Sequence, residues 1–192
     1  MQRNMEQNLS RQELQKLRNN RTGIAIFQFT WILVFVCLVV VDIQLRSSYA
    51  TWPPDGVQKL GIGLPALVTV GLIVSSVLAH RAYNGLKAGG SNESFLTLWR
   101  VVIALGLVFI AVMTYQWLTV PISGQYSALF RVMTAYHGIH ALVIGAFLWR
   151  VYTFTRAKVY SAKHFWPIEA AVKLWDFVTV AWVLFFIVLY VI

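Results

Sequence analysis

Five apolar stretches, each long enough to cross a lipid bilayer, constrain the fold of this chain more than any other feature. The first, Thr22 to Val41, contains no charged residue, and as a helix it matches the roughly 30 Å thickness of the hydrocarbon core. The others lie at residues 61–79, 101–118, 132–149 and 170–192. Of the 192 residues, 58% are apolar and 12% are charged, about half the charged share of a soluble domain. We therefore expect an all-α integral membrane bundle of five transmembrane helices.

The stretches are evenly distributed, which indicates one domain. We expect helices at about 22–44, 60–86, 96–120, 130–155 and 168–192. Together they form a single membrane domain over residues 22–192, preceded by a cytoplasmic tail over residues 1–21. Within that tail Ser10 and Glu13 have the spacing of a capping box, which predicts a short helix over residues 11–20 that leads into the membrane.

The distribution of basic residues predicts the orientation. One side of the membrane receives the N-terminal tail and the second-to-third and fourth-to-fifth connections, whose basic residues are Arg3, Arg11, Lys16, Arg18, Arg21, Arg81, Lys87, Arg100, Arg150, Arg156, Lys158 and Lys163. The other side has Arg46, Lys59 and Arg131. By the positive-inside rule the N-terminus is cytoplasmic, and after five spans the C-terminus lies outside. Topology thus explains the net charge of +9, and we expect no nucleic-acid partner.

Two histidines lie within the fourth apolar stretch. His137 and His140 are three residues apart, so both project from one side of a helix, well inside the bilayer. They either ligate a metal or haem, or they are neutral imidazoles that form hydrogen bonds with neighbouring helices. One such pair cannot supply both axial ligands of one haem and falls short of a complete zinc or copper site, which favours the second interpretation. Because the four histidines lie on three or more elements, a haem-binding alternative stays open, although His80 and His164 lie at predicted cytoplasmic helix ends and so at a different depth from the pair.

Three ionisable residues begin the fifth helix. Glu169, Lys173 and Asp176 are spaced i, i+4 and i+7, so they share one stripe of that helix, and Lys173 can pair with either acid. Charged groups in membrane helices are costly and tend to mark function or inter-helix pairing. A proton-transfer group is one interpretation, and a partly buried ion cluster that holds this helix against its neighbours is the favoured one.

Signals of a self-contained active site are missing from the sequence. It has no glycine-rich phosphate loop after a strand and no nucleophile with a base beside it. Its one cysteine, Cys37, can form neither an internal disulfide nor a metal pair. We expect no catalytic, cofactor-binding or metal-binding residue, and interpret the polar residues as structural.

Two motifs resemble a known family. Residues 134–140 read TAYHGIH, and residues 169–182 read EAAVKLWDFVTVAW, with His164 shortly before. In this combination they resemble subunit III of haem–copper terminal oxidases, the cytochrome c oxidase subunit III family, in its short bacterial form with five helices. The chain departs from the family pattern at five positions, where Gln116 replaces a glutamate, Met113 a glutamine, Lys173 an aromatic residue, Asp176 a histidine and Thr179 an aspartate.

The resemblance implies a non-catalytic subunit of a complex that reduces dioxygen to water and pumps protons. Such a subunit packs against the catalytic subunit I, contacts other oxidase subunits and phospholipid, and supports proton uptake and access of lipid and oxygen. It binds no cofactor itself, and haem and copper lie in the partner subunits. We expect a multi-pass protein of the bacterial inner membrane. The residues expected to provide inter-helix polar contacts or to line a lipid cleft are His137, His140, Glu169, Lys173, Trp175, Asp176 and Trp182.

Three alternatives follow from the same observations. An accessory subunit of a nitric oxide reductase would share the fold. A haem b-binding membrane anchor would use the histidines. A small transporter would need a substrate site at broken helices near the midplane, against which the long unbroken apolar stretches argue.

Overall fold

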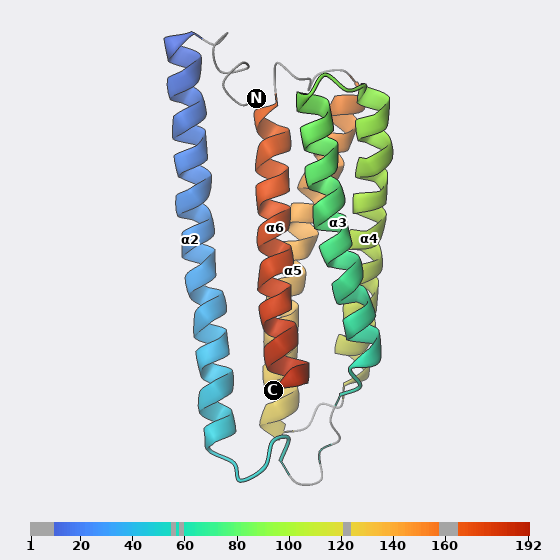
Figure 1. Cartoon of the computed structure of the whole chain (residues 1–192). Helices are drawn as coiled ribbons and strands as arrows, with labels where there is room; N and C mark the ends of the chain where they lie inside the picture. Colours follow the sequence, from blue (N-terminus) through green and yellow to red (C-terminus); the bar gives the residue numbers. More distant parts are fainter. Residues whose placement is uncertain (1–9, 55–56, 58–59, 121–123, 158–164) are drawn as a thin grey trace.

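Five long helices form an up-and-down bundle in the computed structural model, which describes residues 10–54, 57, 60–120, 124–157 and 165–192 (Figure 1). Their bounds are α2 Arg11–Ser47, α3 Gly63–Lys87, α4 Asn92–Thr119, α5 Gly124–Arg156 and α6 Trp166–Phe186, after which the π-helical turn η1 covers Ile187–Val191. Each of the five is long and apolar enough to cross a membrane, and the described residues include no strand. The predicted all-α fold with five spans is therefore confirmed.

Helix α6 lies at the centre of the arrangement. It packs against α3 and α5, and α4 completes the bundle by packing against α3 and α5. Helix α2 stands to one side and contacts mainly α6 (Figure 1). The same difference appears in burial, because 56% of the apolar segment of α6 is buried, whereas 6% is buried in α2. Side chains of α6 therefore contact each of the other four helices. For this reason the polar residues of α6 have partners on several elements.

Helices α2 and α4 begin before the predicted apolar stretches, because a serine side chain caps the start of each helix. Helix α2 begins at Arg11, well before the predicted residue 22, because Ser10 and Glu13 form the predicted capping box: the Ser10 hydroxyl accepts from the Glu13 N–H at 3.3 Å, and Glu13 accepts from the Ser10 N–H at 2.8 Å. Residues 11–21, assigned to the tail from the sequence, are thus part of α2. Likewise Ser91 accepts from the Ser94 N–H at 3.2 Å and starts α4 at Asn92.

The start of α2 and the C-terminus lie at opposite ends of the bundle (Figure 1). The orientation in the membrane remains a prediction from the basic residues. Several residues used in that prediction or in the haem alternative lie outside the described part of the chain: Arg3, Lys59, Lys158, Lys163 and His164.

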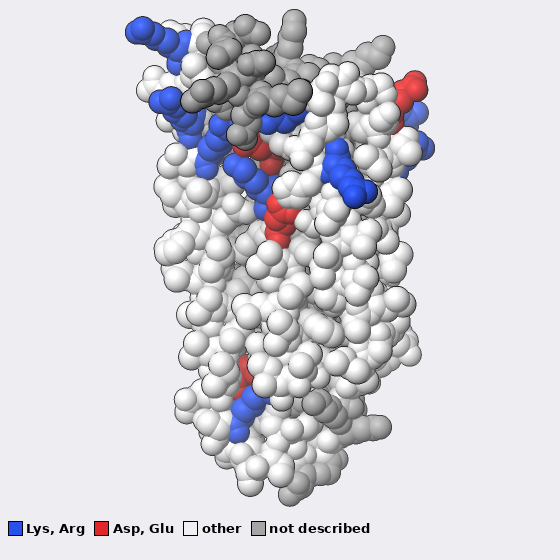
Figure 2. Space-filling view, viewed as in Figure 1, with Lys and Arg blue, Asp and Glu red and all other residues white. Residues whose placement is uncertain are grey.

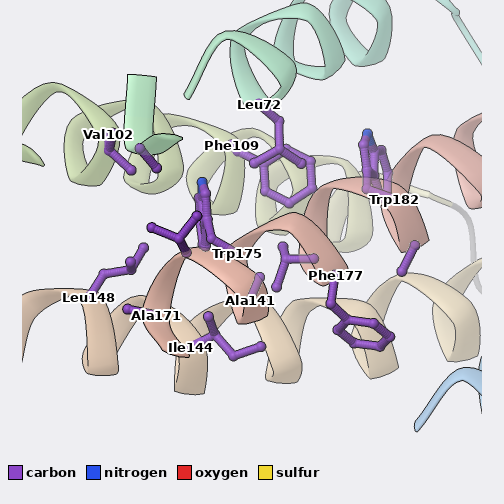
Figure 3. Close-up of a cluster of buried hydrophobic side chains, with 14 of the residues drawn as sticks. Leu72, Val102, Phe109, Ala141, Ile144, Leu148, Ala171, Trp175, Phe177 and Trp182 are labelled. Atoms are coloured by element: carbon purple, nitrogen blue, oxygen red, sulfur yellow. The ribbon is translucent and has the colours of Figure 1, made fainter. Parts of the chain in front are cut away.

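The core is formed by large side chains at the interface of α3, α4, α5 and α6 (Figure 3). The fully buried set includes three tryptophans, Trp99, Trp175 and Trp182. Tryptophans 175 and 182 project from the same side of α6, toward α3 and α4 (Figure 3). On the opposite side of α6, Ala171 and Phe177 lie toward α5, where Ala141 and Ile144 are labelled (Figure 3), so α6 packs on both sides.

Candidate functional site

Glu169 joins three helices near the end of the bundle at which α2 begins. Its carboxylate accepts from Arg21 of α2 through two parallel contacts, Nε to Oε1 and Nη2 to Oε2, both 2.9 Å. Lys173, one turn along α6, lies 3.0 Å from Oε1, and the Tyr83 hydroxyl of α3 donates to Oε2 at 3.1 Å. Glu169 is 7% exposed, so four hydrogen bonds and two cations compensate a carboxylate that is almost removed from solvent.

Asp176 forms a second polar cluster, two turns further along α6. It accepts a short hydrogen bond from the Ser76 hydroxyl, and its Oδ2 lies 2.7 Å from His80 Nε2. Both partners belong to α3. The side chains of His80 and Asp176 remain 51% and 33% exposed, which leaves this pair open at the surface of two membrane-spanning helices.

The two clusters are built from matching stripes on antiparallel helices. On α3, Ser76, His80 and Tyr83 have the same i, i+4, i+7 spacing as Glu169, Lys173 and Asp176 on α6. In Figure 2 most of the coloured atoms lie in the upper part of the face, a smaller red and blue group lies near its lower end, and the middle of the face is uncharged. The predicted stripe on α6 is therefore a polar contact line with α3 and α2, and Lys173 pairs with Glu169, whereas Asp176 finds its partners on α3.

Trp175 and Trp182 fix the remaining contact between α6 and α3. The indole of Trp175 donates to the Ser75 hydroxyl at 2.9 Å, and that of Trp182 donates to the Thr69 hydroxyl at 2.8 Å. The ring of Trp175 also lies so close to Gly106 of α4 that a Cβ at that position would approach it to 2.8 Å. The glycine therefore makes room for an indole that is 1% exposed.

The two histidines of α5 behave differently from the prediction of inter-helix hydrogen bonds. His140 Nδ1 lies 2.7 Å from the carbonyl oxygen of Tyr136, on its own helix. Neither ring nitrogen of His137 has a hydrogen-bond partner among the described residues. Both rings instead pack edge-on against aromatic side chains: His140 against Trp31 of α2 and His137 against Phe109 of α4. The described residues supply no inter-helix hydrogen bond to either ring, and the two imidazoles pack between helices against aromatic side chains instead.

A further polar group lies at the opposite end of the bundle. Asp42, 1% exposed, pairs with Arg46 one turn later on α2 at 2.6 Å, and Arg46 also donates a short hydrogen bond to the Val188 carbonyl in η1. Gln116, which replaces a glutamate of the family pattern, accepts from the Tyr190 hydroxyl at 2.8 Å. These contacts tie the end of α6 to α2 and α4.

The sequence analysis missed the cross-helix partners Arg21, Tyr83, Ser75 and Thr69. Arg21 had a detectable signal, because it is the last basic residue before an uncharged helix and a buried acid on another helix needs a cation at that depth. The α3 stripe of Ser76, His80 and Tyr83 could have been recognised by its spacing. Ser75 and Thr69 could not, since small hydroxyl residues are common in membrane helices for packing alone.

The arrangement provides inter-helix connections rather than a reaction centre. The described residues contain no group of three or more histidine, cysteine, aspartate or glutamate side chains that could hold a metal ion. Glu169 and Asp176 are paired with basic side chains on α2, α3 and α6. The fold and site define a multi-pass helical membrane protein whose helices are joined by polar contacts.

The chain belongs to the cytochrome c oxidase subunit III family, which it matches over residues 6–192. It is 27% identical over 175 residues to cytochrome c oxidase subunit 3 of Synechocystis sp., covering 88% of this chain and 73% of that protein. The protein of the same name from Thermostichus vulcanus is 28% identical, covering 88% of this chain and 85% of the relative. For the relative from Paracentrotus lividus the identity is 30%, over 73% of this chain and 55% of that protein.

The resemblance inferred from the two motifs is thereby confirmed. The chain is a non-catalytic subunit III of an oxidase and a multi-pass membrane protein. As a subunit it assembles with other oxidase subunits, which is the coarse form of the predicted partnership.

Proposed function

We propose that this chain packs against subunit I, the catalytic subunit of a haem–copper terminal oxidase, and stabilises it. Haem and copper are held by the partner subunits. In this complex the chain supports proton uptake and the access of phospholipid and oxygen, and it resides in the bacterial inner membrane with its N-terminus in the cytoplasm. The names of its relatives support the oxidase context.

One observation supports a polar contact with a partner subunit. Asp176 and His80 are partly exposed on the outer surface of membrane-spanning helices. Asp176 lies about 15 Å along α6 from its first residue, at 1.5 Å per residue. A charged side chain facing hydrocarbon is unfavourable by about 2.5–3.5 kcal/mol on insertion scales. A neighbouring transmembrane helix that covers this pair with a hydrogen-bond donor would remove the unfavourable exposure to lipid.

A double substitution tests this contact. His80→Leu together with Asp176→Leu removes both polar groups, so no unpaired charge is left in the bundle. We expect recovery of the catalytic subunit with the tagged chain to fall about tenfold, as for the loss of a charge-assisted hydrogen bond of about 1.5 kcal/mol. Leu67→Phe changes another exposed position of α3, 69% exposed, and is the control that should leave recovery unchanged. Full recovery of the catalytic subunit with the double variant would exclude this surface as the contact.

The composition of the purified complex distinguishes the remaining alternative. An oxidase should show haem a and copper in the partner subunits. Haem b without copper would instead indicate the accessory subunit of a nitric oxide reductase, for which no contact in the described residues gives separate support.

A further inference from the structure

A pocket of about 270 Å³ lies between α4 and α5, beside α6. Its walls are mostly apolar and include, among others, Phe109, Met113, His137, Gly138, Leu142 and Trp182. Two residues at its edge, Ile139 and Leu142, are 62% and 60% exposed on the outer surface of α5. The pocket is therefore accessible from the surrounding membrane rather than from either aqueous side.

One polar group in this wall, beside Thr114 and Thr134, is a buried histidine with unused hydrogen-bonding capacity. His137 is 1% exposed, and neither Nδ1 nor Nε2 has a partner among the described residues. A neutral imidazole offers one N–H donor and one acceptor nitrogen. Leaving such a group unpaired in an apolar interior is unfavourable by about 1–3 kcal/mol.

Neighbouring rings do not supply the missing bonds. The ring of His137 lies 5.3 Å from that of Trp182 and 5.7 Å from that of Phe109, centroid to centroid. The Trp182 N–H is already donated to Thr69, so it is not directed at the imidazole. A contact of the imidazole N–H with an aromatic face is a weak interaction and leaves the acceptor nitrogen unsatisfied.

The depth of His137 restricts the chemistry of a ligand. It is thirteen residues from the first residue of α5, about 20 Å along the helix at 1.5 Å per residue, and thus in the middle of a span of 33 residues. Phospholipid headgroups and ions are held at the membrane surfaces, outside the roughly 30 Å hydrocarbon core. What reaches this depth is neutral and mainly apolar, and to satisfy the imidazole it needs an oxygen that accepts a hydrogen bond.

We propose that the pocket between α4 and α5 binds a neutral, mainly apolar molecule from the membrane, whose carbonyl or hydroxyl oxygen accepts a hydrogen bond from His137. The site shares Trp182 with the contact between α6 and α3 but includes none of Arg21, Glu169, Lys173 or Asp176, and it does not depend on the assembly role. A quinone would provide a carbonyl oxygen as the acceptor, and a long-chain alcohol would provide a hydroxyl oxygen.

Gly138 allows the pocket to be filled without disturbing the bundle. A Cβ at Gly138 meets no atom within 4 Å, and the residue lines the pocket, so Gly138→Leu places a side chain in this space. Gly145 lies two turns along the same helix, has equally open surroundings and lines a different pocket. Gly145→Leu is therefore a matched control for added volume on α5.

The experiment uses the intact detergent-purified complex and two photoreactive probes, a diazirine-bearing decyl-benzoquinone and a diazirine-bearing decanol. Light-induced adducts on this chain are mapped by mass spectrometry over a range of probe concentrations. We expect adducts of one or both probes within residues 109–117 or 134–142. The half-saturating concentration should rise at least tenfold in Gly138→Leu and stay within twofold in Gly145→Leu.

His137→Phe provides an independent test, because it keeps a ring in place but removes the hydrogen bond. The half-saturating concentration should rise about fivefold, the effect of one hydrogen bond of about 1 kcal/mol. The probe that is more affected identifies the carbonyl or the hydroxyl form of the ligand. Adducts confined to other parts of the chain, or equal labelling of the wild-type chain and of His137→Phe, would overturn the proposal, whether or not Gly138→Leu assembles.

Discussion

Breaking the Arg21–Glu169 pair should loosen α2 from the bundle. Helix α2 contributes little burial, and its polar contacts with α6 at this end include that pair and a hydrogen bond from the Gln28 side chain to the Lys173 carbonyl at 2.9 Å. Glu169→Gln keeps the shape of the side chain but removes the charge that Arg21 and Lys173 share. We expect the complex to release this chain at a lower temperature while the initial turnover of the oxidase stays close to normal.

The magnitude follows from the exposure of the two side chains. Exposed ion pairs contribute about 0–1 kcal/mol, and loss of one partner from a buried pair is unfavourable by about 3–5 kcal/mol. The side chains of Arg21 and Glu169 are 27% and 9% exposed, so the pair lies between these limits. We expect a loss of about 2 kcal/mol, which for a chain of this size corresponds to a shift of roughly 4–8 °C.

A double-mutant cycle separates the pair from other effects. Arg21→Gln, Glu169→Gln and the double variant are heated in detergent, and the release of this chain from the complex is followed by size-exclusion chromatography. The double variant should be less destabilised than the sum of the single variants, with a coupling of about 1–2 kcal/mol. Additive effects within about 0.5 kcal/mol, or an immediate loss of turnover with unchanged release temperature, would refute the assembly role of Glu169.

Two further substitutions test the contact of α6 with α3 and α4. Trp175→Phe removes the hydrogen bond to Ser75 and should destabilise the chain by about 1 kcal/mol, measured as the release temperature; Trp149→Phe, at a position 56% exposed, should change it little. Gly106→Ala places a methyl group against the Trp175 ring and should destabilise by about 1–3 kcal/mol. Gly138→Ala, in open surroundings, should be neutral or slightly stabilising, and equal effects at the two glycines would contradict the close contact.

Features that depend on one helix alone could be predicted from the sequence. Charge-free stretches predict the spans because the hydrocarbon core requires about twenty apolar residues in a helix. The Ser10–Glu13 spacing predicts a helix start because the capping hydrogen bonds join residues three apart. The stripe of Glu169, Lys173 and Asp176 was predictable for the same reason, since it depends on the helical repeat alone.

Partners across helices were not predictable in the same way. Glu169 meets Arg21 across 148 positions of sequence, and the pairing of Lys173 with Glu169 instead of Asp176 depends on where α3 places His80 and Ser76. The surroundings of His137 depend on aromatic rings from three other helices, so its missing hydrogen bonds could only be recognised in the folded bundle.

The measurement that tests the central claim most directly is a reduced-minus-oxidised haem spectrum of the complex purified through a tag on this chain, repeated after the chain has been stripped off alone. The account predicts haem a in the intact complex together with a large catalytic subunit, and no haem on the isolated chain. The stripped complex should retain its haem and its initial turnover but lose activity sooner. Haem that stays with the isolated chain would contradict the non-catalytic role and return His80, His137 and His140 to consideration as ligands.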